Sequence, residues 1–394
     1  MATKSINQEF LISGYLEDLT GNQLINLEDS IVSIAIKKDF MTDIMPLFVV
    51  NLKVDYATRE ILRTNDFRIA LTIDEFDSTA EMGEENNIDY IPSDNTLNTI
   101  LKIFDKNIQP IDLKEDPDND ENATSQKFEL SFACIPEQIY NRNSKVINDV
   151  YKNASNNEIL IDILNTENTK LYIDPSDNTD RENTLFIPPL NISKAIEYLQ
   201  QNYGLYNSAY NLFFDLNTTY LIKKYNNEYI QNKLILNILS QNDLSSSTIY
   251  TDIEYDDETG NVTKILKTAP VFTTSADVMS NILGGNAIIG SYGENYELIT
   301  RRYEYNSDES KVRYYWNPSR SYLFEESQNK IPRIFTTIPL NNISPNFFSI
   351  LTKVEIESEN QDIAGIYNIE SIRCVFGTSN YKNYQCTTML SLSK

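Results

Sequence analysis

Five carboxylates fall within residues 251–261, TDIEYDDETGN, and side chains of this type could support acid–base chemistry. A glycosidase places two carboxyl groups roughly 5–10 Å apart in a cleft, and burial raises the pKa of one of them. Glu254 and Asp257 are the pair that this segment would offer to such an enzyme. Because the segment ends in ETGN, which is typical of a turn, a solvated hairpin tip is the favoured interpretation.

A second acidic run, DPDNDENATSQK at residues 116–127, begins like a calcium-binding loop. Asp116, Asp118 and Asp120 occupy the first, third and fifth positions of such a loop. The sixth position requires glycine and holds Glu121, and the twelfth requires a bidentate glutamate and holds Lys127. The run therefore predicts a solvated acidic surface loop.

Four glycines occur in residues 281–293, NILGGNAIIGSYG, but in neither of the orders that cradle phosphates, GxGxxG or GK[ST]. They are better explained by a turn or by the close approach of another backbone. The chain also contains no histidine, which removes the commonest zinc ligand and the usual general base near neutral pH. We therefore expect no catalytic residue, no metal site and no cofactor.

Arginine and aromatic side chains are interleaved in two neighbouring segments, TRRYEY at 300–305 and KVRYYWNPSRSYLF at 311–324. Such a mixture can stack on nucleic acid, but Tyr, Trp and Arg are also the residues enriched in protein–protein interfaces. In a chain this acidic a protein interface is preferred, with ordinary strand faces as the simpler alternative. The candidate interface residues are Arg301, Arg302, Tyr303, Arg313, Tyr314, Tyr315 and Trp316.

The overall charge argues against stable binding of nucleic acid. The net charge is -24, from 33 basic and 57 acidic residues, whereas neutralising phosphates requires clustered Lys and Arg. Cys134, Cys374 and Cys386 show no CxxC spacing, which fits a reducing compartment better than a disulfide scaffold. Neither a signal-peptide core nor an apolar run of membrane-spanning length is visible, so we expect a soluble protein made in a cytoplasm, with no membrane partner.

A chain of 394 residues suggests more than one domain, and its pattern divides into three regions. Residues 1–140 and 226–394 alternate between apolar and polar side chains, which is typical of β-strands with one buried face. Hairpins are expected around residues 306–310 and 359–364, and CTTMLSLS is expected to close the second sheet. The clearest inward positions in the first region are Phe48, Val50, Leu52, Val54, Phe67, Ile69, Leu71 and Ile73.

Residues 141–225 switch to a helical period and read as an α/β insertion. Residues 144–165, SKVINDVYKNASNNEILIDILN, predict two short helices. A further helix is expected to begin after the N-cap Asn191, which follows Pro188-Pro189, and to end at Gly204. Two strands are expected around Asp215–Thr218. The chain is thus predicted to be mainly β with an α/β insertion, an α+β fold.

The segment IPPLNISKAIEYLQQNYGLYNS, followed by NLFFDLNTTYLI, resembles the middle of tail-hub proteins from contractile-tailed bacteriophages. In these proteins a Pro-Pro-Leu segment starts a helix that ends in Tyr-Gly-Xaa-Tyr, and a strand with an Asp and aromatics follows. The early DFMTDIMPLFVVNLKV is similar to the opening of their first barrel, and the late GIYNIESI is similar to a strand near the end of their second.

The resemblance implies a first tail-tube-like β-barrel domain at 1–140, an α/β insertion domain at 141–225, and a second β-barrel domain with additional α/β elements at 226–394. It implies a homotrimer, a ring that joins the tail tube protein to the central spike protein within the virion baseplate, assembled in the host cytoplasm. DNA would pass through the lumen only in transit, and the excess of negative charge could line that lumen and repel phosphate.

Other functions remain open at this point. Another baseplate component, such as a wedge or tube-initiating protein, would have a similar composition without needing to form trimers. A tail-borne carboxylate-dependent glycan hydrolase would use Glu254 and Asp257, and a glycan-binding adhesin would use the exposed Tyr and Trp side chains. A turnover assay or a glycan array would separate these two from a scaffold.

Overall fold

The structure is a computed structural model. It describes residues 5–64, 66–80, 89–92, 96–109, 128–165, 169–178, 181–206, 210–223, 232–238, 249–255, 262–268, 271–274, 334–341, 343–357, 364–378 and 383–393.

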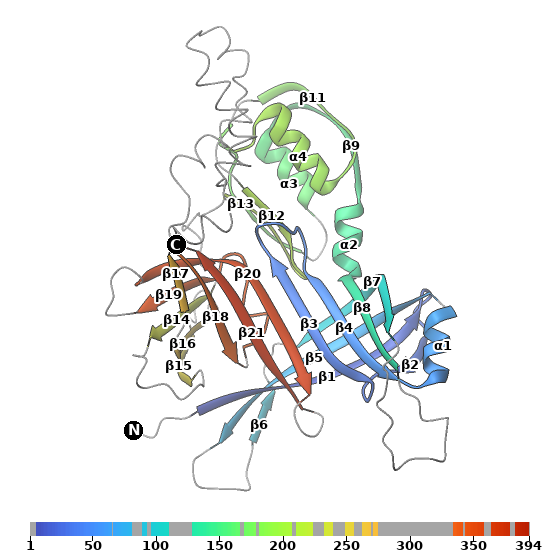
Figure 1. The fold of residues 1–394 in the computed structure, drawn as a ribbon. Coiled ribbons are helices and arrows are strands. Elements are labelled where there is room, and N and C mark those ends of the chain that lie inside the picture. Colours follow the sequence, from blue (N-terminus) through green and yellow to red (C-terminus); the bar gives the residue numbers. More distant parts are fainter. Residues whose placement is uncertain are drawn as a thin grey trace, which may run out of the picture.

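The described residues are mainly β, as predicted (Figure 1). The helices are α1 (Tyr56–Thr64), α2 (Glu137–Ser144), α3 (Asn156–Leu164) and α4 (Ile192–Tyr203). The strands up to the insertion are β1 (Ser5–Asp18), β2 (Gln23–Asn26), β3 (Ile31–Asp39), β4 (Leu47–Val54), β5 (Phe67–Ala80), β6 (Asp89–Pro92), β7 (Leu97–Gln109) and β8 (Phe128–Pro136). The insertion carries β9 (Val146–Ser155), β10 (Lys170–Ile173), β11 (Arg181–Asn191), β12 (Tyr210–Phe214) and β13 (Thr218–Lys223). The later strands are β14 (Lys233–Ile238), β15 (Ile249–Tyr255), β16 (Val262–Thr268), β17 (Val271–Thr274), β18 (Ile334–Asn341), β19 (Lys353–Glu357), β20 (Gly365–Thr378) and β21 (Asn383–Ser393).

Eight antiparallel strands pair in a circuit that returns to its start, and we call this circuit the eight-stranded ring. Its order is β20, β3, β4, β8, β7, β5, β1 and β21, and β21 pairs again with β20. Both ends of the chain therefore contribute to one ring, because β20 and β21 close the sheet begun by β1 to β8. The division of the chain at 140 and 225, with a barrel in each flanking region, stays a prediction.

The long strands β20 and β21 extend beyond the ring into a second part of the same sheet (Figure 1). At its first residues β20 pairs with β19, and further along it pairs with β3. Similarly, β21 pairs with β1 near its start and with β18 over the rest of its length. The strands β14, β16 and β15 continue outward from β19, and β17 continues outward from β18. The expected β19–β20 pair is confirmed. Residues 386–393 form a strand as expected, which pairs with β18 and β20.

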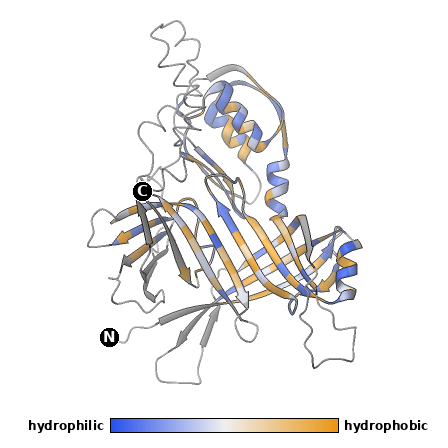
Figure 2. Cartoon of the chain, viewed as in Figure 1, coloured by the Kyte–Doolittle hydropathy of each residue, from blue (hydrophilic) through white to orange (hydrophobic). Residues whose placement is uncertain are grey.

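One continuous apolar core includes buried side chains from all eight strands of the ring. The predicted inward positions of β4 and β5, such as Val50 and Ile69, are all buried, so the period-two prediction is confirmed there. Figure 2 shows the corresponding hydrophobic stretches along the ring strands. An eight-stranded ring is just wide enough for side chains to fill its interior. Its centre is therefore a packed core.

The insertion has a second core beneath α3 and α4. Helix α4 follows the prediction closely: the Asn191 side chain accepts a hydrogen bond from the Lys194 backbone N–H at 2.9 Å, and Gly204 ends the helix with φ at 69°. The hairpin of β12 and β13 also lies where it was expected, on either side of Asp215–Asn217. No helix in the described part of the chain is long and apolar enough to cross a membrane.

The prediction of two short helices in residues 144–165 is wrong for the first of them. Residues Val146–Ser155 form strand β9, which pairs antiparallel with β11, and only the second predicted helix exists, as α3. The apolar residues of this run recur at helical spacing, and pairing with β11, which a local pattern does not reveal, made the segment a strand. The register of β9 with β11 shifts between Ile187 and Leu190, where Pro188 and Pro189 have no N–H to donate.

Candidate functional site: a buried polar junction

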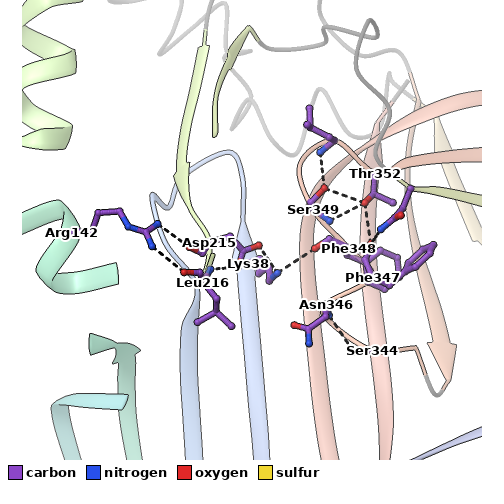
Figure 3. Close-up of polar contacts among 12 residues, drawn as sticks. Lys38, Arg142, Asp215, Leu216, Ser344, Asn346, Phe347, Phe348, Ser349 and Thr352 are labelled. Carbon is purple, nitrogen blue, oxygen red and sulfur yellow. Dashed lines mark hydrogen bonds and ion pairs between the residues drawn. The ribbon is translucent and has the colours of Figure 1, made fainter. Parts of the chain in front are cut away.

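The turn between β12 and β13 carries Asp215 into the contact between the insertion and the eight-stranded ring (Figure 3). The Lys38 ammonium, on β3, donates to Asp215 Oδ2 at 2.7 Å and to the Phe348 carbonyl oxygen at 3.2 Å. The two charged side chains are only 7% and 13% exposed. One buried ion pair thus joins the ring, the insertion and the segment at residues 343–352.

Arg142, near the end of α2, holds the same turn from the other side (Figure 3). Its guanidinium donates to the Asp215 carbonyl oxygen and the Thr219 hydroxyl, each at 3.2 Å, and to the Leu216 carbonyl oxygen at 3.0 Å. Burial lowers the pKa of Arg142, and the nearby charge of Asp215 opposes that shift. The planar guanidinium can bind three acceptors at once, which a lysine could not do with the same geometry.

Backbone and aromatic contacts complete the attachment of the hairpin. The Phe214 N–H donates to the Ile44 carbonyl oxygen, in the connection between β3 and β4, at 2.8 Å. The rings of Phe40 and Phe213 meet edge to face with their centroids 4.8 Å apart. Such a pair adds about 0.5–1.5 kcal/mol beyond the area it buries. The hairpin is therefore held by an ion pair, a backbone bond and an aromatic pair at once.

The segment at residues 343–352 presents the Phe348 carbonyl through a compact set of its own hydrogen bonds. The Ser349 N–H donates to the Thr352 hydroxyl at 2.9 Å, and that hydroxyl donates to the Phe347 carbonyl at 3.2 Å. The Asn232 side chain donates to the same carbonyl at 2.8 Å. Because its side chains satisfy the backbone of the turn, the segment can stay buried without regular secondary structure.

The junction is suited to mechanical coupling. Its cations face carboxylate and carbonyl oxygens, and these interactions join elements from three distant parts of the chain. Breaking such a buried pair costs far more than breaking a surface pair. The arrangement therefore fixes how the insertion sits on the ring.

The sequence alone did not single out Lys38, Arg142 or Asp215 as a group. A signal for Lys38 was present, because in SIVSIAIKK it follows Ile34 and Ile36 at period two and so falls on the buried face. A buried lysine on a strand requires an acceptor. The identity of that acceptor, 177 residues away, had no local signal.

The predicted interface lies outside the described residues. Its members are Arg301, Arg302, Tyr303, Arg313, Tyr314, Tyr315 and Trp316. So do the glycine-rich segment 281–293, the acidic run 116–127 and Asp257, while Glu254 belongs to β15 with its side chain not described. The three cysteines are buried, and burial raises the pKa of the Cys134 thiol to about 12. Within the described residues, no group of three His, Cys, Asp or Glu side chains could hold a metal ion.

Residues 15–394 match the family model described as the bacteriophage PBS1 gene 109 protein. The chain belongs to this family. The match confirms the resemblance to bacteriophage proteins that the sequence motifs indicated. No curated protein matches the chain.

Several solved structures match at low identity. A tail protein from Neisseria meningitidis MC58 is 10% identical, with 98% of this chain and 96% of that chain covered and a TM-score of 0.45. The 43 kDa tail protein of prophage MuSo2 from Shewanella oneidensis is 9% identical, with 96% of each chain covered and a TM-score of 0.43. The lidless PdpA–VgrG complex is 11% identical over the whole of this chain, which spans 66% of the matched chain, with a TM-score of 0.44.

Proposed function

We propose that the chain is a structural component of a phage tail baseplate, the central hub ring that joins the tail tube to the cell-puncturing spike. Membership of a bacteriophage family supports this proposal, as do the hub-like motifs around α4. The observation that carries it is the eight-stranded ring with the insertion fixed to it by the Lys38–Asp215 junction. A rigid β scaffold of this kind suits a part that transmits force between tube and spike.

The filled interior of the ring has a consequence for the passage of DNA. Apolar side chains from all eight strands occupy the centre, so DNA cannot pass through a single copy of the chain. A channel would have to lie between copies, and a homotrimer around a central lumen provides one. With a net charge of -24, a lumen lined by this protein would repel phosphate rather than bind it. DNA would then be in transit only.

The partners in this proposal are the tail tube protein, the central spike protein and other baseplate proteins. The mass of the purified protein in solution, measured by light scattering alone and then with tube and spike proteins, tests it. A trimer of three 45.3 kDa chains, alone or on adding the spike, is the expected result. A monomer that assembles with neither tube nor spike would refute the hub, and a monomer that binds only other baseplate proteins would indicate a wedge.

A further inference from the structure

Besides Lys38, a second lysine is buried in the sheet. Lys353, the first residue of β19, is only 3% exposed, and its Nζ donates to the Oδ1 of Asn368 at 2.6 Å. Asn368 lies directly opposite Lys353 in the antiparallel register of β19 and β20. The backbones of two paired strands therefore hold an amine and a carboxamide against each other where little water reaches.

The same polar row continues onto β21 and includes a carboxyl group. Ser393 lies opposite Asn368 on the other side of β20 and is fully buried. Its hydroxyl donates to Oε1 of Glu370, which follows Asn368 by two residues along β20. Hydroxyl and carboxyl groups of this kind can pass protons between reacting atoms. Amine, amide, hydroxyl and carboxyl thus form one cluster across three strands.

The amine of Lys353 is prepared to act as a nucleophile, for which it must be neutral. Burial lowers the pKa of Lys353 to about 8, so that about a tenth of these amines are neutral at pH 7 and most are neutral at pH 9. Lys233, opposite Lys353 on β14, forms an ion pair with Glu355 of β19. The neighbouring carboxylate on β19 is therefore already matched by another cation.

The distance between the reacting atoms suits an attack on the amide carbon. With Nζ at 2.6 Å from Oδ1 and a C=O bond of about 1.2 Å, Nζ lies about 3–4 Å from Cγ of Asn368. A reactive arrangement holds such atoms about 3–3.5 Å apart. A small rotation of the flexible lysine side chain would therefore turn the hydrogen bond into an attack on Cγ.

We propose that Lys353 and Asn368 join in an intramolecular isopeptide bond after the chain has folded. The bond from Nζ to Cγ forms and the bond from Cγ to Nδ2 breaks. The neutral amine gives up one proton, which the Glu370 carboxyl and the Ser393 hydroxyl pass to the departing Nδ2. One ammonia leaves and a secondary amide remains, so the reaction consumes no oxidant, cofactor or second substrate.

The cross-link would reinforce the place where the outer strands meet the ring. β19 carries β14, β16 and β15 on its other side, and β20 continues into the eight-stranded ring. A covalent bond between β19 and β20 would keep these strands attached when the sheet is pulled. Because most of the amine is protonated at pH 7, freshly folded protein still carries the unreacted lysine and converts slowly. The inference does not depend on the hub proposal.

Mass spectrometry of the denatured wild-type chain tests the reaction directly. Protein held at pH 9 should accumulate a form lighter by one ammonia, about tenfold faster than protein held at pH 7. Trypsin should no longer cut after Lys353 in this form, so residues 334–373 should remain one fragment. Its fragment ions should place the missing ammonia at the link between Lys353 and Asn368. An unchanged mass at pH 9 would overturn the inference.

Four variants separate the cross-link from loss of ammonia at other asparagines. Lys353→Arg and Asn368→Ala should abolish the lighter form, whereas Lys194→Arg, at an exposed position of α4, should react like the wild type. Glu370→Gln should slow the reaction by a factor on the order of 10². Thermal melting checks that each variant folds. A lighter form that persists in Lys353→Arg would refute the link, and an unchanged rate in Glu370→Gln would refute the role of the carboxyl.

Discussion

The buried ion pair between Lys38 and Asp215 allows a quantitative test of the junction. Lys38→Met removes the cation and leaves the Asp215 carboxylate buried, with the Leu216 N–H, at 3.0 Å, as a remaining donor. Asp215→Leu removes the carboxylate and leaves the ammonium with the Phe348 carbonyl. At 7% and 13% exposure, solvent screens neither charge effectively. Removing one partner of such a pair costs about 3–5 kcal/mol of the free energy of unfolding.

The double variant Lys38→Met/Asp215→Leu separates the interaction from simple loss of packing. With both charges gone, neither partner is left buried without the other, and Arg142 keeps its bonds to the two carbonyls and the Thr219 hydroxyl, so the free energy of unfolding should return to within about 1 kcal/mol of the wild type. Urea denaturation measures all four proteins. Hydrogen exchange of the β12 and β13 amides should accelerate in the single variants, because the hairpin loses its attachment to the ring.

A surface pair provides the matched control. Lys194 and Glu197 are 2.7 Å apart on α4 and are both exposed. Removing Glu197 should cost no more than about 0.5 kcal/mol. If the single variants at Lys38 and Asp215 cost as little as this control, the junction would contribute nothing to coupling the insertion to the ring, and the reasoning would be refuted.

Three further predictions concern single positions. Ser155→Ala removes the N-cap of α3, where the Ser155 hydroxyl and the Glu158 carboxylate form a capping box. This change should lower the free energy of unfolding by about 1 kcal/mol. An unchanged urea midpoint would contradict this prediction. Gly204→Ala places a side chain at φ 69° and should cost about 1–2 kcal/mol, so a neutral result would mean that α4 ends differently. Burial lowers the pKa of Lys353 from 10.5 to about 8. The buried charge therefore lowers the free energy of unfolding by its full amount below pH 8. This destabilisation decreases as the pH rises from 8 to 10.5, because the folded protein then loses the proton before the unfolded chain does. Lys353→Met should therefore be more stable than the wild type at pH 7, by about 1–3 kcal/mol, and the difference should narrow by pH 10.5; a difference independent of pH would contradict the assignment.

Local patterns predicted the regular elements well where a single period dominated. The β4 and β5 strands alternate cleanly, and α4 has an Asn N-cap, an apolar stripe and a terminal Gly, so their buried faces could be read directly, although β5 continues to Ala80, beyond the alternating run. The β9 prediction failed because the apolar residues of this segment recur at helical spacing, whereas its pairing with β11 made it a strand. Tertiary pairing can therefore override a clear local period.

The sequence by itself determined the class of the protein: mainly β, strongly acidic, without histidine, and with motifs that resemble phage tail-hub proteins. These properties depend on composition and on neighbours a few residues apart. Only the tertiary structure decided that β20 pairs with β3 and that β21 pairs with β1, which closes the ring from the two ends of the chain. It also decided that Lys38 meets Asp215. Contacts between residues hundreds of positions apart depend on how whole elements pack, and the local pattern around each residue carries no record of its partner.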